Sequence, residues 1–421
     1  MKKIGLVYRR NASSWVSCQS ITRNLIQCYK NAFPEAEIVT FENDASFSIY
    51  EVRRQAHKAA EFGPDLLAFL DHAPHPGVFL SFFDEAALNS STRIALHVFG
   101  DFTLHPGAWL EMGQILCRRG VKFICASEKQ KRLVQKFLVG SDQLVESIPF
   151  PVDEKQYYVD LEVLPSRADE FKCLYAGRLS LQKNVLPLVR SFATFIKNFH
   201  PKAELCLAGP MDDMGYPYLG KVPPPGLLAF DLNRLIEESL PEHLQKRIRY
   251  LGILSPEQLR RQFNHSHIMI SLSGHNDEDF GMAPAEALLS GCPVILSDWG
   301  GYSSFGNIDS KKSRLLPVRI GEKSVVPEHA DVIKALITAS TASLDLPERL
   351  RIQEAARSYC SISSVSEKLR NSLGGSSLEQ FERFSPLFSK VSQAFQINPS
   401  APFKSGNGFS NLYREIYDCY L

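Results

Sequence analysis

The chain has 421 residues, of which 44% are hydrophobic and 22% are charged, and its formal net charge is +1. This composition is typical of a folded globular protein and not of a disordered one. The balanced charge also argues against a nucleic-acid partner, since nucleic-acid-binding domains are normally strongly basic. Because the length exceeds that of one ordinary core, two domains are expected.

The cysteines and the apolar runs indicate the compartment. No pair among the nine cysteines has C-x-x-C spacing, so no structural zinc site is expected, and scattered thiols are typical of a reducing compartment. The apolar run after Met1-Lys2-Lys3 ends at Arg9-Arg10, which is too short for a signal peptide, and no run approaches the ~18 apolar residues of a membrane span. A cytoplasmic protein is predicted, and peripheral binding to the cytoplasmic face of the membrane remains open.

Residues 1–150 alternate short apolar runs with amphipathic stretches, a pattern that predicts βαβ units and a parallel sheet. The predicted strands are Ile4–Tyr8, Glu37–Phe41, Asp65–Leu70, Arg93–Phe99, Val121–Ala126 and Leu144–Pro149. The predicted helices include Cys18–Ala32, Tyr50–Phe62 and Glu128–Leu138. This half is therefore predicted to be an N-terminal Rossmann-like domain.

Two prolines in four residues at 148–153 interrupt the alternation, since neither a helix nor a central strand accommodates them. A linker is predicted over 151–170, a second Rossmann-like domain over 171–345, and C-terminal helices and a tail over 346–421 that could pack back on the first domain. The second series of strands is Cys173–Ala176, Glu204–Ala208, Ile248–Leu251, His267–Leu272, Val294–Ser297 and Leu315–Val318. The second series of helices includes Val185–Asn198, Leu232–Gln245, Pro256–Phe263, Met282–Ser290 and Asp331–Thr341.

The fold class predicted from this alternation is α/β, with two doubly wound domains. Ligands of such sheets bind beyond the carboxyl ends of the strands, and a site between the two halves is expected. The segment Met211–Leu228 is rich in glycine and proline and is interpreted as a long surface loop, either a lid or an inert excursion. The tail from Gly374 is poorly patterned until Asn411–Tyr420, where a short helix is predicted.

The polar loop 273–279 follows a predicted buried strand and leads into a predicted helix. The first N–H groups of a helix lack intrahelical partners and carry the positive end of its dipole, so this segment predicts an anion site. Glu278 precedes the helix and Glu286 lies inside it, so the two carboxylates could bracket one extended ligand. Taken alone, such an acidic pair more often only stabilises a helix start.

The wider segment is similar to the E-x7-E region of retaining GT-B glycosyltransferases of family 4, also called group 1. The residues that carry this resemblance are Glu278-Asp279-Phe280-Gly281, Pro284-Ala285-Glu286-Ala287-Leu288, Gly291-Cys292-Pro293-Val294-Ile295 and Asp298-Trp299-Gly300-Gly301. Tyr175-Ala176-Gly177-Arg178-Leu179, followed by Lys183-Asn184, resembles the Gly-Arg…Lys donor motif of the same family. The resemblance covers about residues 148–369 well.

The resemblance is weaker in the N-terminal half. The family often has a glycine-rich turn after the first strand, whereas this chain has Arg9-Arg10-Asn11-Ala12-Ser13-Ser14. His97 stands where the family commonly places a histidine near the donor sugar, and its alternative is a partly buried histidine bonded to backbone. The acidic residue that usually follows the Gly-Gly pair is replaced by Tyr302-Ser303-Ser304-Phe305. Weaker candidates for acceptor contacts are Asp101, His72 and His75.

The resemblance implies a GT-B fold, with two Rossmann-like domains facing a deep cleft, and a retaining hexosyltransferase. It also implies that residues 1–150 form the acceptor-side domain and residues 171–345 the nucleotide-sugar donor domain. The enzyme's partners would be a nucleotide-sugar donor and a carbohydrate, lipid-linked or protein acceptor, with no cofactor and no metal. Arg178 and Lys183 would hold the diphosphate, whose charge suits a guanidinium fork and an ammonium. Glu278 would orient the donor sugar, Glu286 would bind the ribose and His97 would contact the sugar. The remaining donor-binding residues implied are Gly177, Phe280, Gly281, Met282 and Ala283.

Other classes of protein remain as alternatives. A non-catalytic GT-B-like subunit that scaffolds a partner transferase would keep the fold without turnover. An epimerase or phosphorylase of GT-B shape would share the fold, although no lysine site for a pyridoxal cofactor is recognisable. A dinucleotide-dependent oxidoreductase would need G-x-G-x-x-G after the first strand, which Gly5-Leu6-Val7-Tyr8-Arg9-Arg10 lacks. The pair Asp212-Asp213 is interpreted as a loop or helix-cap pair and not as a metal site.

Overall fold

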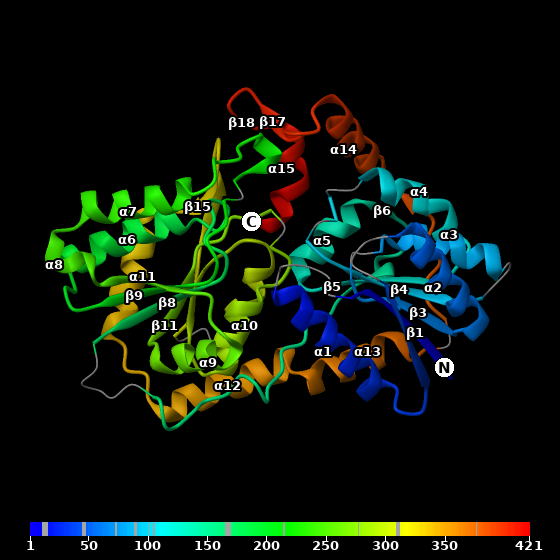
Figure 1. Ribbon diagram of the computed structural model, residues 1–421, viewed down its shortest axis with the longest axis horizontal. Helices are drawn as coiled ribbons and strands as arrows, with labels where there is room; N and C mark the ends of the chain where they lie inside the picture. The colour runs from blue at the N-terminus through cyan, green and yellow to red at the C-terminus, as the bar shows by residue number, and fades with distance from the viewer. Residues whose placement is uncertain are drawn as a thin grey trace. The chain divides into compact units, whose positions relative to one another are not determined.

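The computed structural model describes residues 1–10, 16–43, 48–71, 74–87, 91–100, 102–103, 106–164, 170–213, 215–276, 278–308, 312–375 and 377–421. The chain divides into two compact units (Figure 1). Unit 1 comprises Met1–Val152 and Cys360–Ile397, and unit 2 comprises Asp153–Tyr359 and Asn398–Leu421. The chain therefore leaves unit 2 after Tyr359 and returns to it at Asn398.

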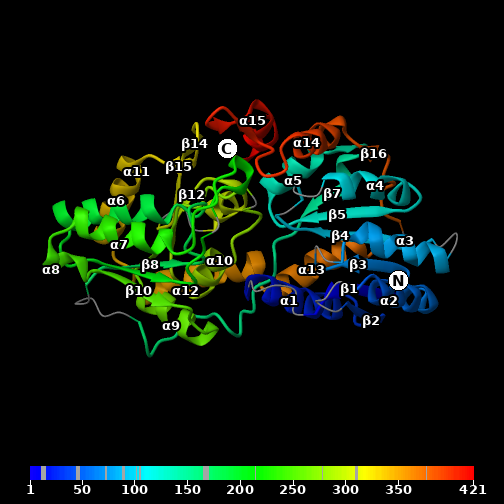
Figure 2. The ribbon, with the colours of Figure 1, turned by 45° about the horizontal axis from the view of Figure 1, so that its top comes forward.

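Unit 1 is built on a six-stranded sheet in the order β2-β1-β3-β4-β5-β7, and all its strand pairs are parallel. Helix α1 packs against α13 on one face, and α3 packs against α4 on the other (Figure 2). The strands are β1 (Lys3–Arg9), β2 (Glu37–Asn43), β3 (Leu66–Phe69), β4 (Arg93–Val98), β5 (Val121–Cys125) and β7 (Val145–Ser147). The helices are α1 (Val16–Ala32), α2 (Ile49–Phe62), α3 (Pro76–Ala86), α4 (Pro106–Leu116), α5 (Glu128–Lys136), α13 (Ile362–Leu373) and α14 (Pro386–Ile397).

Unit 2 repeats this architecture with the sheet order β10-β9-β8-β11-β12-β13, again with parallel pairs. Helix α6 packs against α7 and α11 on one face, and α9 packs against α10 on the other. The strands are β8 (Lys172–Ala176), β9 (Glu204–Ala208), β10 (Ile248–Gly252), β11 (Ile268–Ser271), β12 (Val294–Ser297) and β13 (Arg314–Leu316). The helices are α6 (Val185–Asn198), α7 (Leu227–Ser239), α8 (Glu242–Gln245), α9 (Pro256–His265), α10 (Met282–Leu289), α11 (His329–Thr341), α12 (Leu346–Cys360) and α15 (Asn411–Tyr417).

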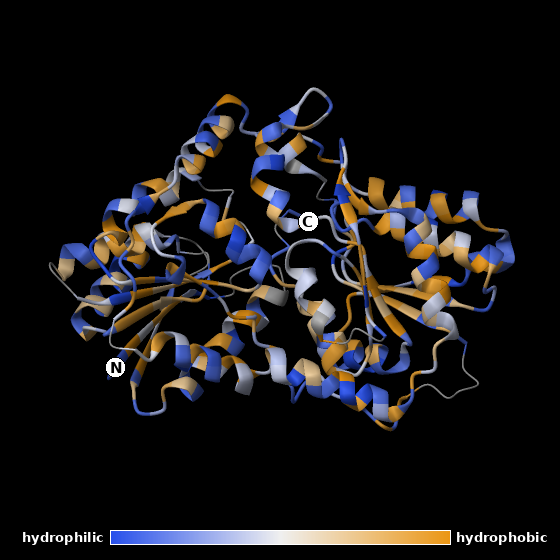
Figure 3. Ribbon diagram, turned by 180° about the vertical axis from the view of Figure 1, so that it is seen from behind, coloured by the Kyte–Doolittle hydropathy of each residue, from blue (hydrophilic) through white to orange (hydrophobic). Residues whose placement is uncertain are grey.

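Short two-stranded pieces complete both units. They are β6 (Leu138–Val139) with β16 (Arg383–Phe384), β14 (Val318–Ile320) with β15 (Val325–Pro327), and β17 (Lys404–Ser405) with β18 (Gly408–Phe409). Short 3-10 turns lie at Asp142–Leu144, Pro217–Leu219, Gly300–Asn307 and Asp418–Tyr420. In Figure 3 the strands of both main sheets are predominantly hydrophobic, as expected for parallel sheets covered on both faces.

Two predicted elements are each divided at a proline, so the prediction of a single helix or strand is wrong there. The predicted helix Leu232–Gln245 is two helices, α7 and α8, because Pro241 has no N–H to donate and its ring would clash with the preceding turn. The predicted strand Leu315–Val318 is divided between β13 and β14 at Pro317 for the same reason. No described helix combines the length and the apolar character that a crossing of the bilayer requires.

Candidate functional site

The candidate site of unit 2 lies where the order of its sheet reverses. From β8 the chain adds β9 and β10 on one side, and it then returns to add β11, β12 and β13 on the other. β8 and β11 are parallel neighbours, so their carboxyl ends meet at one edge of the sheet. Ligands of doubly wound sheets bind at such a switch point. The residues that follow these two strands are Gly177-Arg178 and the loop 272–281, which are the two motifs found in the sequence.

Arg178 follows β8 directly and forms an ion pair with Asp212. The turn before it is shaped by a close backbone approach, because a Cβ on Gly209 would lie 2.0 Å from the carbonyl oxygen of Gly177. The Tyr175 hydroxyl donates a 2.5 Å hydrogen bond to the carbonyl of Arg178. The sequence interpretation missed Asp212 as a partner, since nothing in the sequence shows that the end of β9 lies beside that of β8.

Lys183 and Glu278 come from the two different motifs and form an ion pair. The ammonium of Lys183 donates to Glu278 Oε2 at 2.5 Å, and the side chains are only 16% and 6% exposed. Solvent screens such a pair weakly. The backbone of Glu278 is also held, because the N–H of Gly301 donates to its carbonyl at 2.7 Å. The Gly300-Gly301 pair therefore shapes the loop that presents Glu278.

Helix α10 begins beside this ion pair. Its N-cap is Gly281 with φ 109°, a left-handed conformation that glycine tolerates. A Cβ there would lie 2.6 Å from the ring of Tyr302, so glycine is required sterically as well. Met282 and Ala283 are half-buried, and the first N–H groups of the helix point toward its N-terminal end. The predicted donor-binding residue Phe280 is fully buried, with its ring 5.2 Å from that of Phe305.

The second glutamate of the motif has a different environment. Glu286 lies in α10, where burial raises the pKa of its carboxyl to about 8, and a hydrogen bond with Tyr157 opposes that shift. Burial and the nearby charge of Glu278 raise the pKa of the half-buried Asp279 to about 7. The structure thus places Glu278 as the partner of a lysine and Glu286 as the partner of a tyrosine, on the two sides of the start of α10.

His97 lies near the end of β4 in unit 1, whereas the site residues described above belong to unit 2. Its Nε2 lies 3.0 Å from the hydroxyl of Tyr29, and it is buried. Burial lowers the pKa of the imidazole to about 3, so the ring is neutral at physiological pH. The partner of His97 is a side chain and not the backbone group of the simpler interpretation. Its contact with a donor sugar stays a prediction.

The weaker acceptor candidates separate into two groups. His75 is the N-cap of α3, and its Nδ1 accepts a 3.1 Å hydrogen bond from the N–H of Gly77. His72, Asp101 and the residues 11–14 of the first loop lie outside the described residues. In the insertion Met211–Leu228, Tyr218 is buried with its ring 5.7 Å from Phe403, so this part of the loop is packed against the C-terminal segment.

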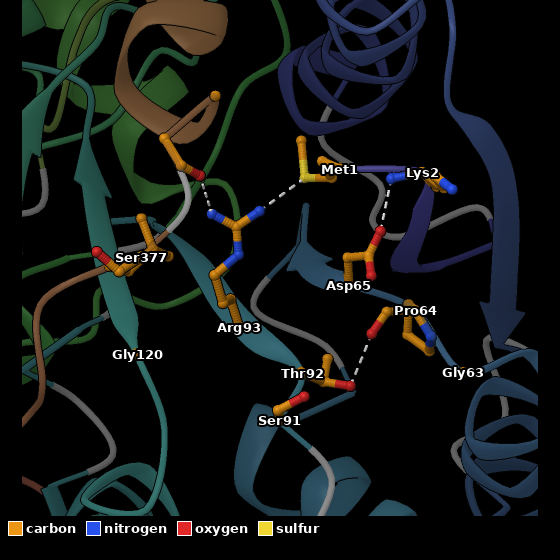
Figure 4. A pocket seen from close by; sticks show the side chains of 13 residues that line it. Met1, Lys2, Gly63, Pro64, Asp65, Ser91, Thr92, Arg93, Gly120 and Ser377 are labelled. Atoms are coloured by element: carbon orange, nitrogen blue, oxygen red, sulfur yellow. Dashed lines mark hydrogen bonds between the residues drawn. The ribbon is translucent and has the colours of Figure 1, made fainter.

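An open hollow in unit 1 lies at the opposite edge of its sheet, at the amino ends of the strands (Figure 4). Its polar groups bond to one another: Arg93 donates to the carbonyl of Gly375 at 2.5 Å, and Asp65 accepts from the N–H of Lys2 at 2.5 Å. Doubly wound sheets bind ligands at the carboxyl ends, so the hollow does not have the position of a substrate site. Within the described ranges, no three His, Cys, Asp or Glu side chains are grouped as metal ligands would be.

Comparison with known proteins gives the class of the domain that holds this site. Residues 160–309 match the model of the family described as Glycosyl transferases group 1, and both sequence motifs lie inside that range. An uncharacterized glycosyltransferase of Methanocaldococcus jannaschii is 25% identical over 133 residues, which are 32% of this chain and 28% of the relative. The chain thus matches just over a quarter of that relative's length.

Solved structures show the same fold over most of the chain. The apo lipopolysaccharide outer core galactosyltransferase WaaB has 15% identity and a TM-score of 0.58, covering 88% of this chain and 99% of its own. WaaG, a glycosyltransferase involved in lipopolysaccharide biosynthesis, has 12% identity and a TM-score of 0.55, covering 89% and 100%. A trehalose-6-phosphate protein from E. coli, bound with UDP-2-fluoro glucose, has 11% identity and a TM-score of 0.57, covering 88% and 98%. The chain therefore has the GT-B fold, and the part of unit 2 at residues 160–309 is similar to the glycosyl transferases group 1 family.

Proposed function

We propose that the chain is a retaining, metal-independent glycosyltransferase of family 4 that takes its sugar from a nucleotide sugar. The observation that carries this proposal is the meeting of Arg178, Lys183 and the start of α10 at the switch point of one sheet. Two cations and a helix N-terminus are the groups that bind a diphosphate. The group 1 model covers all three, and one structural relative is bound with UDP-2-fluoro glucose.

Each residue has one role in this proposal. Arg178 and Lys183 bind the diphosphate oxygens, and the N–H groups of Met282 and Ala283 add partial positive charge. Glu278 accepts hydrogen bonds from the donor sugar, and Glu286 accepts them from the ribose. In the absence of a donor, Asp212 neutralises Arg178 and Glu278 neutralises Lys183. When a diphosphate binds, each cation exchanges its carboxylate partner for a phosphate oxygen.

The reaction that follows is departure of the nucleoside diphosphate as the acceptor attacks the same face of the sugar. The bond between the anomeric carbon and the phosphate oxygen breaks, and the bond to the acceptor oxygen forms. The departing phosphate oxygen takes the acceptor's proton. Charge that builds up on the diphosphate is stabilised by positioned cations, and this electrostatic term is commonly the largest in catalysis. His97, from unit 1, would contact the sugar.

The acceptor and the location are proposed more broadly. The acceptor is a hydroxyl of a carbohydrate, a lipid-linked sugar or a protein, and the enzyme acts in the cytoplasm, alone or at the membrane surface. Metal independence follows from the proposed roles, since Arg178, Lys183 and α10 supply the positive charge that Mg²⁺ supplies in other transferases. Turnover is therefore expected to be unchanged by EDTA, and full loss that Mg²⁺ restores would contradict this part.

A thermal-shift panel of nucleoside diphosphates and their sugars tests the donor. A ligand stabilises the folded state by RT ln(1 + [L]/Kd), so the correct donor should give the largest shift. Slow hydrolysis of that donor, followed by NMR of the released sugar, should show the anomeric configuration retained. Binding without any turnover, with or without candidate acceptors, would favour the non-catalytic subunit, and a panel with no shift would contradict the donor site.

A further inference from the structure

Residues 398–421 form a C-terminal segment that belongs to unit 2, although they follow the second part of unit 1. The segment is firmly built into the unit. The Ser410 hydroxyl caps α15 by accepting from the N–H of Tyr413 at 3.3 Å, and the ring of Phe409 stacks on Tyr413 at 3.9 Å. The guanidinium of Arg414 donates to the carbonyls of Ile320 and Gly321 at 2.8 and 2.9 Å.

One end of the segment reaches the loop that carries Glu278. The side-chain amide of Asn276 donates a 3.2 Å hydrogen bond to the hydroxyl of Tyr417, and both residues are buried. Asn276 stands two residues before Glu278. Buried polar groups of this kind are costly to leave without a partner, so the bond fixes the loop at this point.

The loop is held a second time through Trp299. The indole N–H of Trp299 donates to the carbonyl of His275 at 2.7 Å, and the ring of Tyr420 packs edge-on against the indole at 5.3 Å and 79°. Trp299 is fully buried. An aromatic contact of this type stabilises the fold beyond the apolar area that it buries.

Gly300 is enclosed between Tyr420 and the carbonyl of Glu278. A Cβ on Gly300 would lie 2.4 Å from the carbonyl oxygen of Glu278 and 3.0 Å from Cε2 of Tyr420. The next residue, Gly301, donates its N–H to the same carbonyl at 2.7 Å. Tyr420 therefore backs the turn that holds the main chain of Glu278.

We propose that the C-terminal segment 398–421 positions Glu278 for the donor sugar, with Tyr417 and Tyr420 as its positioning residues. Tyr417 contacts Asn276, two residues before Glu278, and Tyr420 contacts Trp299 and Gly300, beside the Glu278 carbonyl. Residues 272–276 and 278–281 lie outside the described strands and helices, so these tertiary contacts decide the conformation of the loop. The sugar role of Glu278 rests on the proposed function, whereas the ordering of the loop does not.

The test compares four single variants of the full chain. Tyr420→Ala removes the ring that backs Gly300, Tyr420→Phe keeps it, and Tyr417→Phe removes only the hydroxyl. The control is Leu421→Ala, because Leu421 is adjacent and exposed. Amide hydrogen exchange is measured for peptides that cover residues 273–281 and 299–302, with β9 as the internal reference.

In Tyr420→Ala, exchange at residues 273–281 and at Gly301 is expected to rise at least about tenfold while exchange in β9 stays unchanged. The same variant should lose at least about tenfold in kcat/KM for the nucleotide sugar but keep its affinity for the nucleoside diphosphate within about threefold. Tyr420→Phe and Leu421→Ala should match the wild type. Tyr417→Phe should show faster exchange at 273–281 alone.

Unchanged hydrogen exchange of the loop in both Tyr420→Ala and Tyr417→Phe would overturn the proposal. So would a loss of affinity for the nucleoside diphosphate in Tyr420→Ala that equals the loss in kcat/KM for the nucleotide sugar. If Tyr420→Ala does not fold, Tyr417→Phe decides by the same exchange measurement. If the wild type binds no nucleotide sugar, the proposed function fails, and hydrogen exchange still tests whether the segment orders the loop.

Discussion

The ammonium of Lys183 lies 2.5 Å from Oε2 of Glu278, and this ion pair joins the two sequence motifs of the donor site. Lys183 follows β8 and Glu278 follows β11, so only the parallel pairing of these strands brings them together. The pair also means that the lysine which should bind phosphate is already balanced by the carboxylate that should bind sugar.

Lys183→Met is expected to destabilise unit 2, because it leaves the buried carboxylate of Glu278 without its cation. Breaking one partner of a buried ion pair costs about 3 kcal/mol. Lys183→Met combined with Glu278→Gln removes both charges and should recover most of that loss. Urea denaturation of the two single variants and the double variant checks this, and additive losses in the double variant would contradict the coupling.

Glu278→Gln alone should separate binding from turnover. Without the carboxylate, the ammonium of Lys183 is available to the diphosphate, so affinity for the nucleoside diphosphate should stay equal or increase. Turnover should fall at least about 100-fold, because a contact that orients the reacting sugar is lost. Calorimetry and a rate assay on the same preparation measure affinity and turnover. Weaker nucleotide binding would contradict the proposal that Lys183 exchanges Glu278 for the diphosphate.

Arg178→Ala should reduce turnover about 100-fold or more and leave the fold intact, since a guanidinium that stabilises leaving-group charge contributes several kcal/mol to the transition state. The control is Arg190→Ala, which removes an exposed arginine of α6 in the same unit. Equal rates for the two variants would remove Arg178 from the phosphate site.

Gly281→Ala should abolish nucleotide binding, because the new methyl group would meet the ring of Tyr302 at 2.6 Å in a backbone with φ 109°. Gly63→Ala is a matched control, with φ 63° and no atom within 4 Å of the added carbon. The control carries only the left-handed strain of about 1 kcal/mol. Melting temperatures and nucleotide affinity of the two variants separate strain from steric collision.

Glu286→Gln should change how stability depends on pH. The pKa of this carboxyl is raised to about 8 from an ordinary 4.5, so the folded state binds the proton more tightly than the unfolded chain. This contribution to stability is complete below pH 4.5 and is lost as pH rises through about 8. Melting temperatures at pH 5, 7 and 9 should therefore show the variant gaining on the wild type as pH rises. A constant difference would show that Glu286 is ionised throughout.

The sequence predicted the main strands of both sheets within a few residues, because each is a short apolar run bounded by polar or turn-forming residues. The boundaries failed at Pro241 and Pro317, where the apolar pattern continues but the backbone cannot. Helix α14 was missed, although its buried residues Phe388 and Val391 stand three apart, as on one face of a helix.

Within the site, local motifs pointed to Arg178, Lys183, Glu278 and the start of α10. Their partners were not predictable in the same way. Asp212, Tyr157 and Tyr302 reach the site from other elements, and no local spacing marks them. The ring of Tyr302, at a position where the resembled family usually has an acidic residue, packs against Gly281 and its hydroxyl lies 2.9 Å from Ser271 Oγ.

The division of unit 2 into two stretches of chain constrains when it can fold during synthesis. Trp299 is enclosed by Tyr420, so the core beneath the donor loop stays open until translation has passed the whole of Cys360–Ile397, which belongs to unit 1. Unit 1 has its complete set of residues at Ile397, where unit 2 still lacks residues 398–421. A released chain that is truncated after Ile397 should therefore fold unit 1 and leave Trp299 of unit 2 accessible to solvent.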